Sequence, residues 1–234
     1  MKAFELTEEQ AARVIAALVA DELSVRFARH IDSMTGAAWN GMTPLGAGGA
    51  ELAGPERAAC AGRVLRFFGI DSCAQEDLEG DCIDDWARFV AGALLRRQTH
   101  FRFTAAGDDA REFMHAADAT YQDAAAAANL LYGRRRAISL VAPHGLMGFA
   151  LTVLAPNLLQ IPSVDARALA PDELSESLIY GDAVIATPTR WRYMIREQVT
   201  APDNAIGVFF GEPMASDLAA SMRKAGFSAQ REIY

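Results

Sequence analysis

The stretch AISLVAPHGLMGFALTVLAP, residues 137 to 156, contains both kinds of element from which the second half of the chain is built. Its first six residues form a short apolar run, which predicts a buried strand. The segment LMGFALTVLAP, residues 146 to 156, predicts a helix directly behind that strand. A strand followed by a helix is the unit from which parallel sheets are made.

The same alternation continues from there to residue 234. Strands are predicted at residues 160–165, 182–187, 205–210 and 228–234, and helices at residues 171–181, 188–199 and 213–227. This alternation predicts β-α-β units and a parallel sheet that helices cover. Ligands of such sheets bind beyond the carboxyl ends of the strands, so the loops after Ala142, Thr187 and Phe210 are candidate ligand loops.

Helical periodicity dominates the beginning of the chain. Thr7 and Gln10 have the spacing of a capping box, and the apolar residues behind them predict a helix that runs to about Ile31. A glycine-rich loop follows. Two further helices are then predicted, at residues 55–68 and 83–95. These patterns together predict a small helical bundle.

The change of pattern predicts an α/β protein of two domains. Residues 1–98 form the helical domain, and residues 99–234 form a partial parallel α/β sheet. A chain of 234 residues is long enough for two small domains, and its 51% hydrophobic content is ordinary for a globular protein.

Charge and hydropathy exclude some classes of partner. The net charge of −8 argues against non-specific binding of nucleic acid and against attraction to anionic membranes. The longest apolar stretch, residues 146–162, is interrupted by Pro156 and is too short to span a bilayer. The one cationic run, Arg134 to Arg136, is interpreted as a helix C-terminal cap and a solvated face.

Cysteine and histidine usage predicts no metal centre. The three cysteines, Cys60, Cys73 and Cys82, form no C-x-x-C pair, and the chain has only four histidines. Free thiols in a reducing cytosol are therefore expected. The N-terminal residues contain no apolar run of the kind found in secretory signals, so a cytoplasmic location is expected.

Two motifs behind predicted strands resemble those of a known superfamily. VAPHGLMGF, residues 141–149, resembles a P-x-x-H-x-x-G-F substrate-side loop, and the sequence from residue 209 to 234 resembles G-x-P-L, a helix and then Y-G-S-T-E. Both motifs are similar to those of the adenylate-forming (AMP-binding) enzymes, which include acyl-CoA and aryl-CoA synthetases. Residues 99–234 would then be the first part of their large domain.

The resemblance implies specific site residues. On the substrate side it assigns His144, Gly148 and Phe149. Against the adenine it assigns Gly211, Glu212, Pro213 and Tyr234. The cofactors it implies are ATP and magnesium, and the activity is adenylation of a carboxylic acid followed by thioester formation. It assigns no catalytic residue in this chain.

The stretch FRFTAAGDDAREFMHAAD, residues 101 to 118, falls where the superfamily has its phosphate loop. Its pattern predicts a strand, a loop and a helix. In an ungapped alignment on His115, the resemblance leaves Thr104, Gly107 and Arg111 as the nucleotide-binding residues.

Acidic residues replace much of that loop. Asp108 and Asp109 place two negative charges where a triphosphate would lie, and each charge costs about 1 kcal/mol or more at about 4 Å. Lost hydroxyl groups remove further hydrogen bonds to charge. Ordinary ATP affinity is therefore not expected, and a magnesium ion bridging the aspartates to phosphate is the alternative.

A third resemblance concerns the helical part. Residues 43–70 resemble the helix-two region of an acyl carrier protein, in which the serine that carries phosphopantetheine corresponds to Gly54. Glycine has no hydroxyl group, so no phosphopantetheine is expected. Such a carrier-like region precedes the ligase domain in some bacterial synthetases of aryl-polyene and pigment pathways.

Two hypotheses of function follow. In the first, the chain is the truncated front part, or one subunit, of an acyl or aryl-acid ligase, inactive alone. In the second, it is a non-catalytic interaction protein of an acyl-chain or pigment biosynthesis system. The expected partners are an acyl carrier protein, a partner ligase subunit or a second copy of the chain, since open sheet edges drive association.

Overall fold

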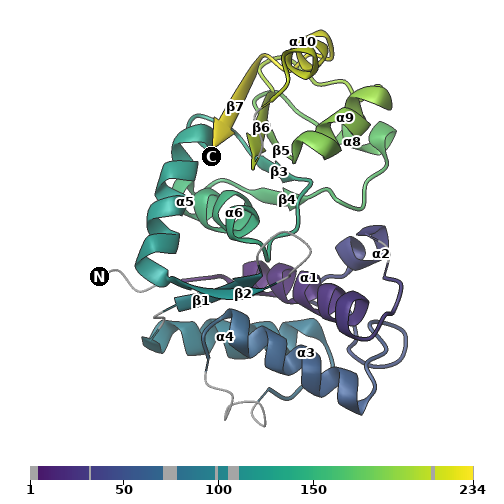
Figure 1. Cartoon of the computed structure of the whole chain (residues 1–234), viewed down its shortest axis with the longest axis vertical. Coiled ribbons are helices and arrows are strands. Elements are labelled where there is room, and N and C mark those ends of the chain that lie inside the picture. Colours follow the sequence, from purple (N-terminus) through teal and green to yellow (C-terminus); the bar gives the residue numbers. More distant parts are fainter. Residues whose placement is uncertain are drawn as a thin grey trace. The chain divides into compact units, whose positions relative to one another are not determined.

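The computed structural model describes residues 5–31, 33–70, 78–97, 100–104, 111–211 and 214–233 (Figure 1). The chain divides into two compact units. The first contains Met1–Thr120 and Pro143–Leu146, and the second contains Tyr121–Ala142 and Met147–Tyr234. Helices and a parallel sheet are both present, so the predicted α/β class is confirmed.

Four helices form most of the first unit. They are α1 (Glu8–Arg26), α2 (Ser33–Ala38), α3 (Gly54–Phe67) and α4 (Ile83–Arg97). The predicted capping box begins α1, where the hydroxyl of Thr7 accepts from the backbone N–H of Gln10 at 3.2 Å. Helix α1 packs against α3 and α4, and fully buried side chains such as Ile15, Leu18 and Trp86 form the core between them.

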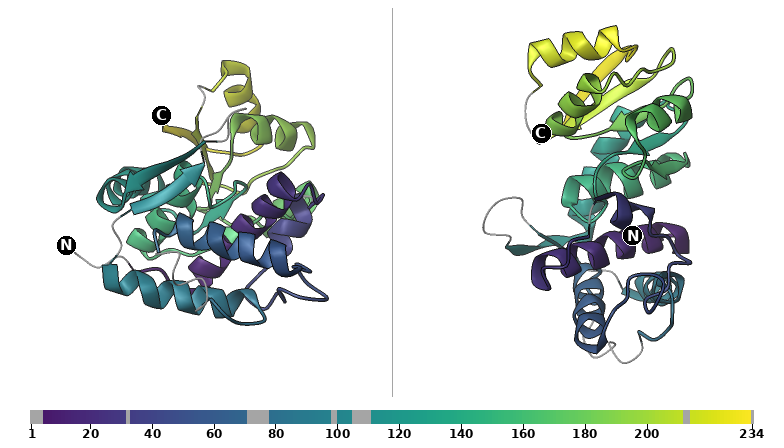
Figure 2. Two further views of the ribbon diagram at one scale, coloured as in Figure 1. Left: turned by 60° about the horizontal axis from the view of Figure 1, so that its bottom comes forward. Right: turned by 90° about the vertical axis from the view of Figure 1, so that its right-hand side faces the viewer.

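A β-hairpin completes the first unit. Strand β1 (His100–Thr104) pairs with β2 (Glu112–Ala116) in antiparallel register, and Thr104 lies opposite Glu112. The hairpin and the helices α1, α3 and α4 can be followed in Figure 2. Phe101 and Phe103 are fully buried and contact the ring of Phe67 on α3, with ring centroids 6.2 and 5.3 Å apart.

The hairpin corrects the predicted order of strand, loop and helix. The segment after the loop is a second strand, and α5 (Ala117–Leu131) begins only where β2 ends. Pairing with β1 satisfies the backbone groups of β2 on one edge, although most of its side chains are exposed. The N–H groups at the start of α5 are therefore separated from the loop by the whole length of β2.

The second unit is built on a five-stranded sheet. Its strands are β3 (Ala137–Ser139), β4 (Ser163–Asp165), β5 (Ala183–Ile185), β6 (Ile206–Phe210) and β7 (Ala229–Ile233). All neighbouring pairs are parallel, in the order β4-β3-β5-β6-β7, which confirms the predicted parallel sheet. Chain order reverses between β3 and β5, and such a switch point is where open α/β sheets bind ligands.

Helices cover both faces of this sheet (Figure 1). Helices α8 (Pro171–Ser177), α9 (Pro188–Arg196) and α10 (Ser216–Lys224) pack on one face through side chains such as Trp191 and Met222. On the other face lie α5, α6 (Leu146–Phe149), a π-helical segment (Ala150–Leu154) and α7 (Ala155–Leu159). Among the described helices, none is long and apolar enough to cross a membrane.

The solvated-face interpretation of the arginine run holds for Arg135, which is exposed, and is wrong for Arg136. Its guanidinium donates to both carboxylate oxygens of Asp182, at 3.0 and 2.7 Å, and Asp182 is fully buried. This hydrogen-bonded carboxylate raises the pKa of Arg136 above its ordinary value. Arg134 donates to the backbone oxygen of Asn204 at 3.0 Å. The run therefore ties the end of α5 to loops at the amino ends of the strands.

Candidate functional site

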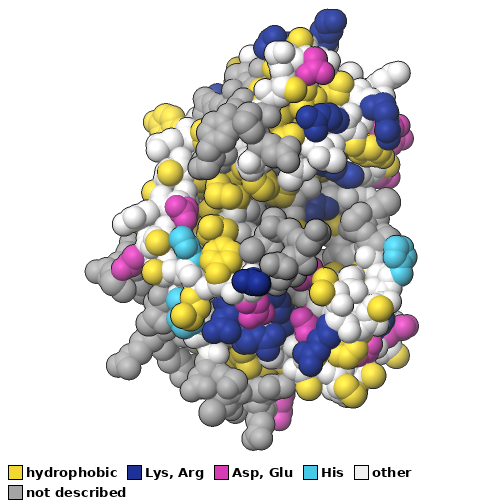
Figure 3. Space-filling view, in the orientation of Figure 1, with side chains coloured by type: hydrophobic (Ala, Val, Ile, Leu, Met, Phe, Trp, Pro, Cys, Tyr) yellow, Lys and Arg dark blue, Asp and Glu magenta, His cyan; other side chains and the backbone are white. Residues whose placement is uncertain are grey.

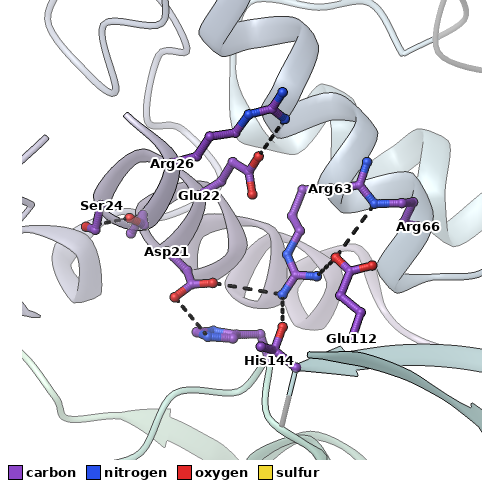
Figure 4. Close-up of polar contacts among 10 residues, drawn as sticks. Asp21, Glu22, Ser24, Arg26, Arg63, Arg66, Glu112 and His144 are labelled. Atoms are coloured by element: carbon purple, nitrogen blue, oxygen red, sulfur yellow. Dashed lines mark hydrogen bonds and ion pairs between the residues drawn. The ribbon is translucent and has the colours of Figure 1, made fainter. Parts of the chain in front are cut away.

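A polar cluster in the first unit is centred on Arg63 of α3 (Figure 4). The residue is only 3% exposed, and it lies on the same face of the helix as Cys60, Val64 and Phe67, which belong to the core. A buried guanidinium is costly unless it is paired and hydrogen-bonded. The neighbours of Arg63 therefore define the chemistry of the cluster.

Three elements supply partners to Arg63. Its Nη1 donates to Oε1 of Glu112 at 2.5 Å, and its Nη2 donates to the hydroxyl of Thr104. The same Nη2 lies 3.9 Å from a carboxylate oxygen of Asp21 on α1. Because Thr104 and Glu112 are paired across the hairpin, one buried side chain holds both strands to the helices.

Glu112 in turn faces three guanidinium groups. Besides Arg63, the Nε of Arg66 lies 3.7 Å from Oε1, and Nη1 of Arg102 lies 3.6 Å from Oε2. The carboxylate is 31% exposed, and the side chains of Arg66 and Arg102 are 39% and 34% exposed. Planar guanidinium groups recognise carboxylate and phosphate through paired hydrogen bonds, so this arrangement is suited to binding an oxyanion.

His144 belongs to the same unit and lies at the edge of this cluster. Its Nε2 is 3.9 Å from Oδ1 of Asp21, which is an ion-pair distance and too long for a hydrogen bond. The pair does not have the geometry of a histidine that a carboxylate orients for proton transfer.

The other predicted substrate-side residues lie in the second unit. Gly148 and Phe149 are buried in α6, and the backbone oxygen of Gly148 accepts a hydrogen bond from the Thr152 hydroxyl at 2.7 Å. Phe149 is fully buried in the core. Both residues follow β3, one of the two strands that flank the switch point.

The predicted nucleotide-binding residues fall in different places. Thr104 ends β1 and Arg111 precedes β2, so they flank residues 105–110, and Arg111 is exposed. Gly211 directly follows β6 and has a φ of +91°, which favours glycine. Gly107, Glu212, Pro213 and Tyr234 lie outside the described residues, as do Asp108 and Asp109.

Sequence reasoning missed the centre of the cluster, although a signal was present. Cys60, Arg63, Val64 and Phe67 have the spacing of an apolar helix stripe, and Arg63 is the one charged member among them. A charge in such a stripe indicates a buried pair. Its partner Glu112 comes 49 residues later, and only the folded hairpin brings it to α3.

The structure describes two of the three cysteines. Cys60 and Cys82 are free, as predicted, and Cys73 lies outside the described residues. Burial, together with the charges of Glu22 and Glu56, raises the pKa of the Cys60 thiol to about 12. In the described part of the chain, no three histidine, cysteine or acidic side chains are grouped to hold a metal ion.

The structure has a weak likeness to a solved structure. The N-terminal domain of FACL13 from Mycobacterium tuberculosis matches with a TM-score of 0.48 and 13% sequence identity. The match covers 95% of this chain and 68% of that chain. A likeness of this strength assigns neither a family nor an activity. No protein-family model and no curated protein matches the chain.

Proposed function

We propose that the chain is a scaffold of the acyl- or aryl-acid ligase type that does not adenylate a carboxylic acid by itself. The motifs around His144 and Gly211 support the ligase-like part of this proposal. Each follows a strand of a parallel sheet, β3 or β6, and the carboxyl ends of such strands are where ligand loops lie.

The proposed lack of adenylation rests on one observation, the position of the Thr104 hydroxyl. The resemblance assigns this hydroxyl to a nucleotide phosphate, but here it accepts a hydrogen bond from the buried Arg63. Glu112 lies opposite Thr104 in the hairpin, and its carboxylate adds a negative charge beside the Thr104 hydroxyl. We infer that Thr104, held by Arg63, and Glu112, with its negative charge, do not fit the role of a triphosphate loop.

Adenylation needs both a held triphosphate and stabilisation of the charge that develops on it. Acidic residues in the same loop, Asp108 and Asp109, oppose both requirements. Magnesium, when bound, would supply charge neutralisation. The residues that would bridge it to phosphate, Asp108 and Asp109, lie outside those that the structure describes.

Exchange of labelled pyrophosphate into ATP tests this proposal. The full chain is incubated with ATP, magnesium and each of a panel of fatty and aromatic acids. No exchange above the rate without protein is expected. Acid-dependent exchange that is abolished by His144→Ala would contradict the proposal, because it would show adenylation by this chain.

The second candidate function is a non-catalytic interaction protein with a carrier-like helical region. Gly54 favours it, because this exposed residue begins α3 where a carrier would have its modified serine. A phosphopantetheinyl transferase and CoA should leave the intact mass of the chain unchanged. A gain of one phosphopantetheine group would rule out an unmodified interaction module.

A further inference from the structure

We propose that Arg63, Arg66 and Arg102 form a binding site for the phosphate group of a small ligand, and that the carboxylate of Glu112 occupies this site in the structure. The site lies on α3 and on the hairpin strand β1. Arg63 and Arg66 lie outside the motifs from which the ligase-like function was proposed, and Arg102 belongs to the stretch 101–118 that falls where the superfamily has its phosphate loop.

The geometry is that of an oxyanion held from several sides. Arg63 donates to Oε1 at 2.5 Å, Arg66 approaches the same oxygen at 3.7 Å, and Arg102 approaches Oε2 at 3.6 Å. Figure 4 shows the contacts of Arg63 and Arg66 meeting at the same oxygen of the Glu112 carboxylate. A surface ion pair needs only one such partner, so three guanidinium groups on one carboxylate call for a further explanation.

The Glu112 carboxylate does not satisfy this site. Two of the three approaches exceed hydrogen-bond distance. Among the described residues, the Nε of Arg102 is buried and has no hydrogen-bond partner. Buried donors are normally paired, so an unpaired one indicates a missing acceptor. A phosphate group has more acceptor oxygens than a carboxylate and could reach donors that Glu112 leaves unused.

The balance of charge also favours a dianion. The three guanidinium groups face two carboxylates, those of Glu112 and Asp21, and the Asp21 carboxylate also lies 3.9 Å from His144. A phosphate monoester carries about 1.5 to 2 negative charges near neutral pH, against one for a carboxylate. Replacing Glu112 by such a group would neutralise the cluster in a chain whose net charge is −8.

A ligand can reach the site from solvent. The side chains of Glu112, Arg66 and Arg102 are each about one third exposed, whereas Arg63 is buried and held by Thr104. In Figure 3, dark blue side chains surround a magenta carboxylate on the surface near the hairpin. Rotation of the Glu112 side chain would open the site without breaking the backbone pairing of β2.

The test is a calorimetric titration of the full chain with inorganic phosphate at constant ionic strength. Glu112→Gln removes the competing charge but keeps an amide oxygen that can accept from Arg63. This variant should bind phosphate about tenfold tighter than the natural chain. The double variant Arg66→Gln with Arg102→Gln should lose binding by at least about tenfold.

Acetate and chloride at equal ionic strength are the controls, and both should bind more weakly than phosphate. Glycerol 1-phosphate distinguishes the source of the phosphate. If glycerol 1-phosphate binds with the same affinity as inorganic phosphate, the site recognises the phosphate group alone. If it binds more tightly, and the double variant loses this binding, the ligand is a phosphate ester. Equal responses of the natural chain and both variants to phosphate would overturn the proposal.

A second measurement covers the case in which Glu112→Gln does not fold. Phosphate should then raise the melting temperature of the natural chain above the value in chloride, since a ligand that binds the folded state stabilises it. The double arginine variant should show no such difference. An identical rise in both proteins would overturn the proposal.

Discussion

Asp182 has the most deeply buried carboxylate among the ion pairs of the second unit. It is fully buried, accepts two hydrogen bonds from Arg136 and accepts a third from the backbone N–H of Ile179 at 2.9 Å. Removing one partner of a buried pair leaves an uncompensated charge. Asp182→Ala should therefore lower the free energy of unfolding by about 3–5 kcal/mol.

Urea denaturation measures this loss, and Asp203→Ala is the matched control because Asp203 is exposed. The control should change the free energy of unfolding by no more than about 0.5 kcal/mol. Equal effects of the two substitutions would show that the Arg136–Asp182 pair does not stabilise the second unit.

Cys60 gives a prediction about reactivity at the residue scale. A pKa near 12, against an ordinary value of 9.0, lowers the thiolate fraction at pH 8 about a thousandfold. Iodoacetamide should therefore label Cys82 before Cys60 in the folded chain, as read by peptide mass mapping. Labelling of Cys60 first would contradict the buried environment.

The raised pKa of Cys60 also sets a direction for stability. The folded state favours the neutral thiol, so its contribution is fully present below pH 9 and is lost as the pH rises toward 12. The free energy of unfolding should fall over this alkaline range more steeply in the natural chain than in a Cys60→Ala variant. If the free energy of unfolding depended on pH in the same way in the two chains, the raised pKa of Cys60 would be contradicted.

At the scale of elements, the hairpin shows what the sequence could and could not predict. Strand β1 was predictable because its buried residues alternate, with Phe101 and Phe103 facing the core. Strand β2 was missed because its side chains are mostly exposed and show no apolar alternation. The backbone pairing with β1, and not the side-chain pattern, determines that it is a strand.

The helix end beside the hairpin depends on one glycine. Gly69 follows α3 with a φ of +62°, and a Cβ atom there would lie 2.4 Å from the backbone oxygen of His100. Gly69→Ala combines backbone strain with displacement of β1, and it should destabilise the chain by about 1–3 kcal/mol. Thermal unfolding followed by circular dichroism is the measurement.

Gly92 is the matched control for this change. It lies inside α4, and a Cβ atom added there would meet no neighbouring atom within 4 Å, so Gly92→Ala should stabilise the helix by about 0.5–1 kcal/mol. The two alanine substitutions should therefore shift the melting temperature in opposite directions. Shifts of the same sign would contradict the role of Gly69.

At the scale of the whole molecule, the sequence predicted the alternation of strands and helices but not how far each strand extends. The predicted strand at residues 137–142 is shortened to Ala137–Ser139, because only these residues pair with both β4 and β5. The functional cluster escaped prediction for a different reason. It joins α1, α3 and the hairpin, and contacts between distant segments leave no local pattern.

The edges of the sheet predict self-association. In the described part of the chain, β4 and β7 each pair with a neighbour on one side, and Val164 on β4 is 37% exposed. Open strand edges and apolar surface favour association. Light scattering coupled to size exclusion should therefore give a mass above that of the 25.2 kDa monomer. A single sharp monomer peak would contradict this expectation.

The most direct test of the proposed function is calorimetric titration of the full chain with ATP and magnesium. With the Thr104 hydroxyl held by Arg63 and with Asp108 and Asp109 in the same loop, the dissociation constant should be no tighter than millimolar, about −4 kcal/mol. Asp108→Ser with Asp109→Ser should tighten binding about tenfold by removing two repulsive charges. A low-micromolar constant for the natural chain would contradict the account.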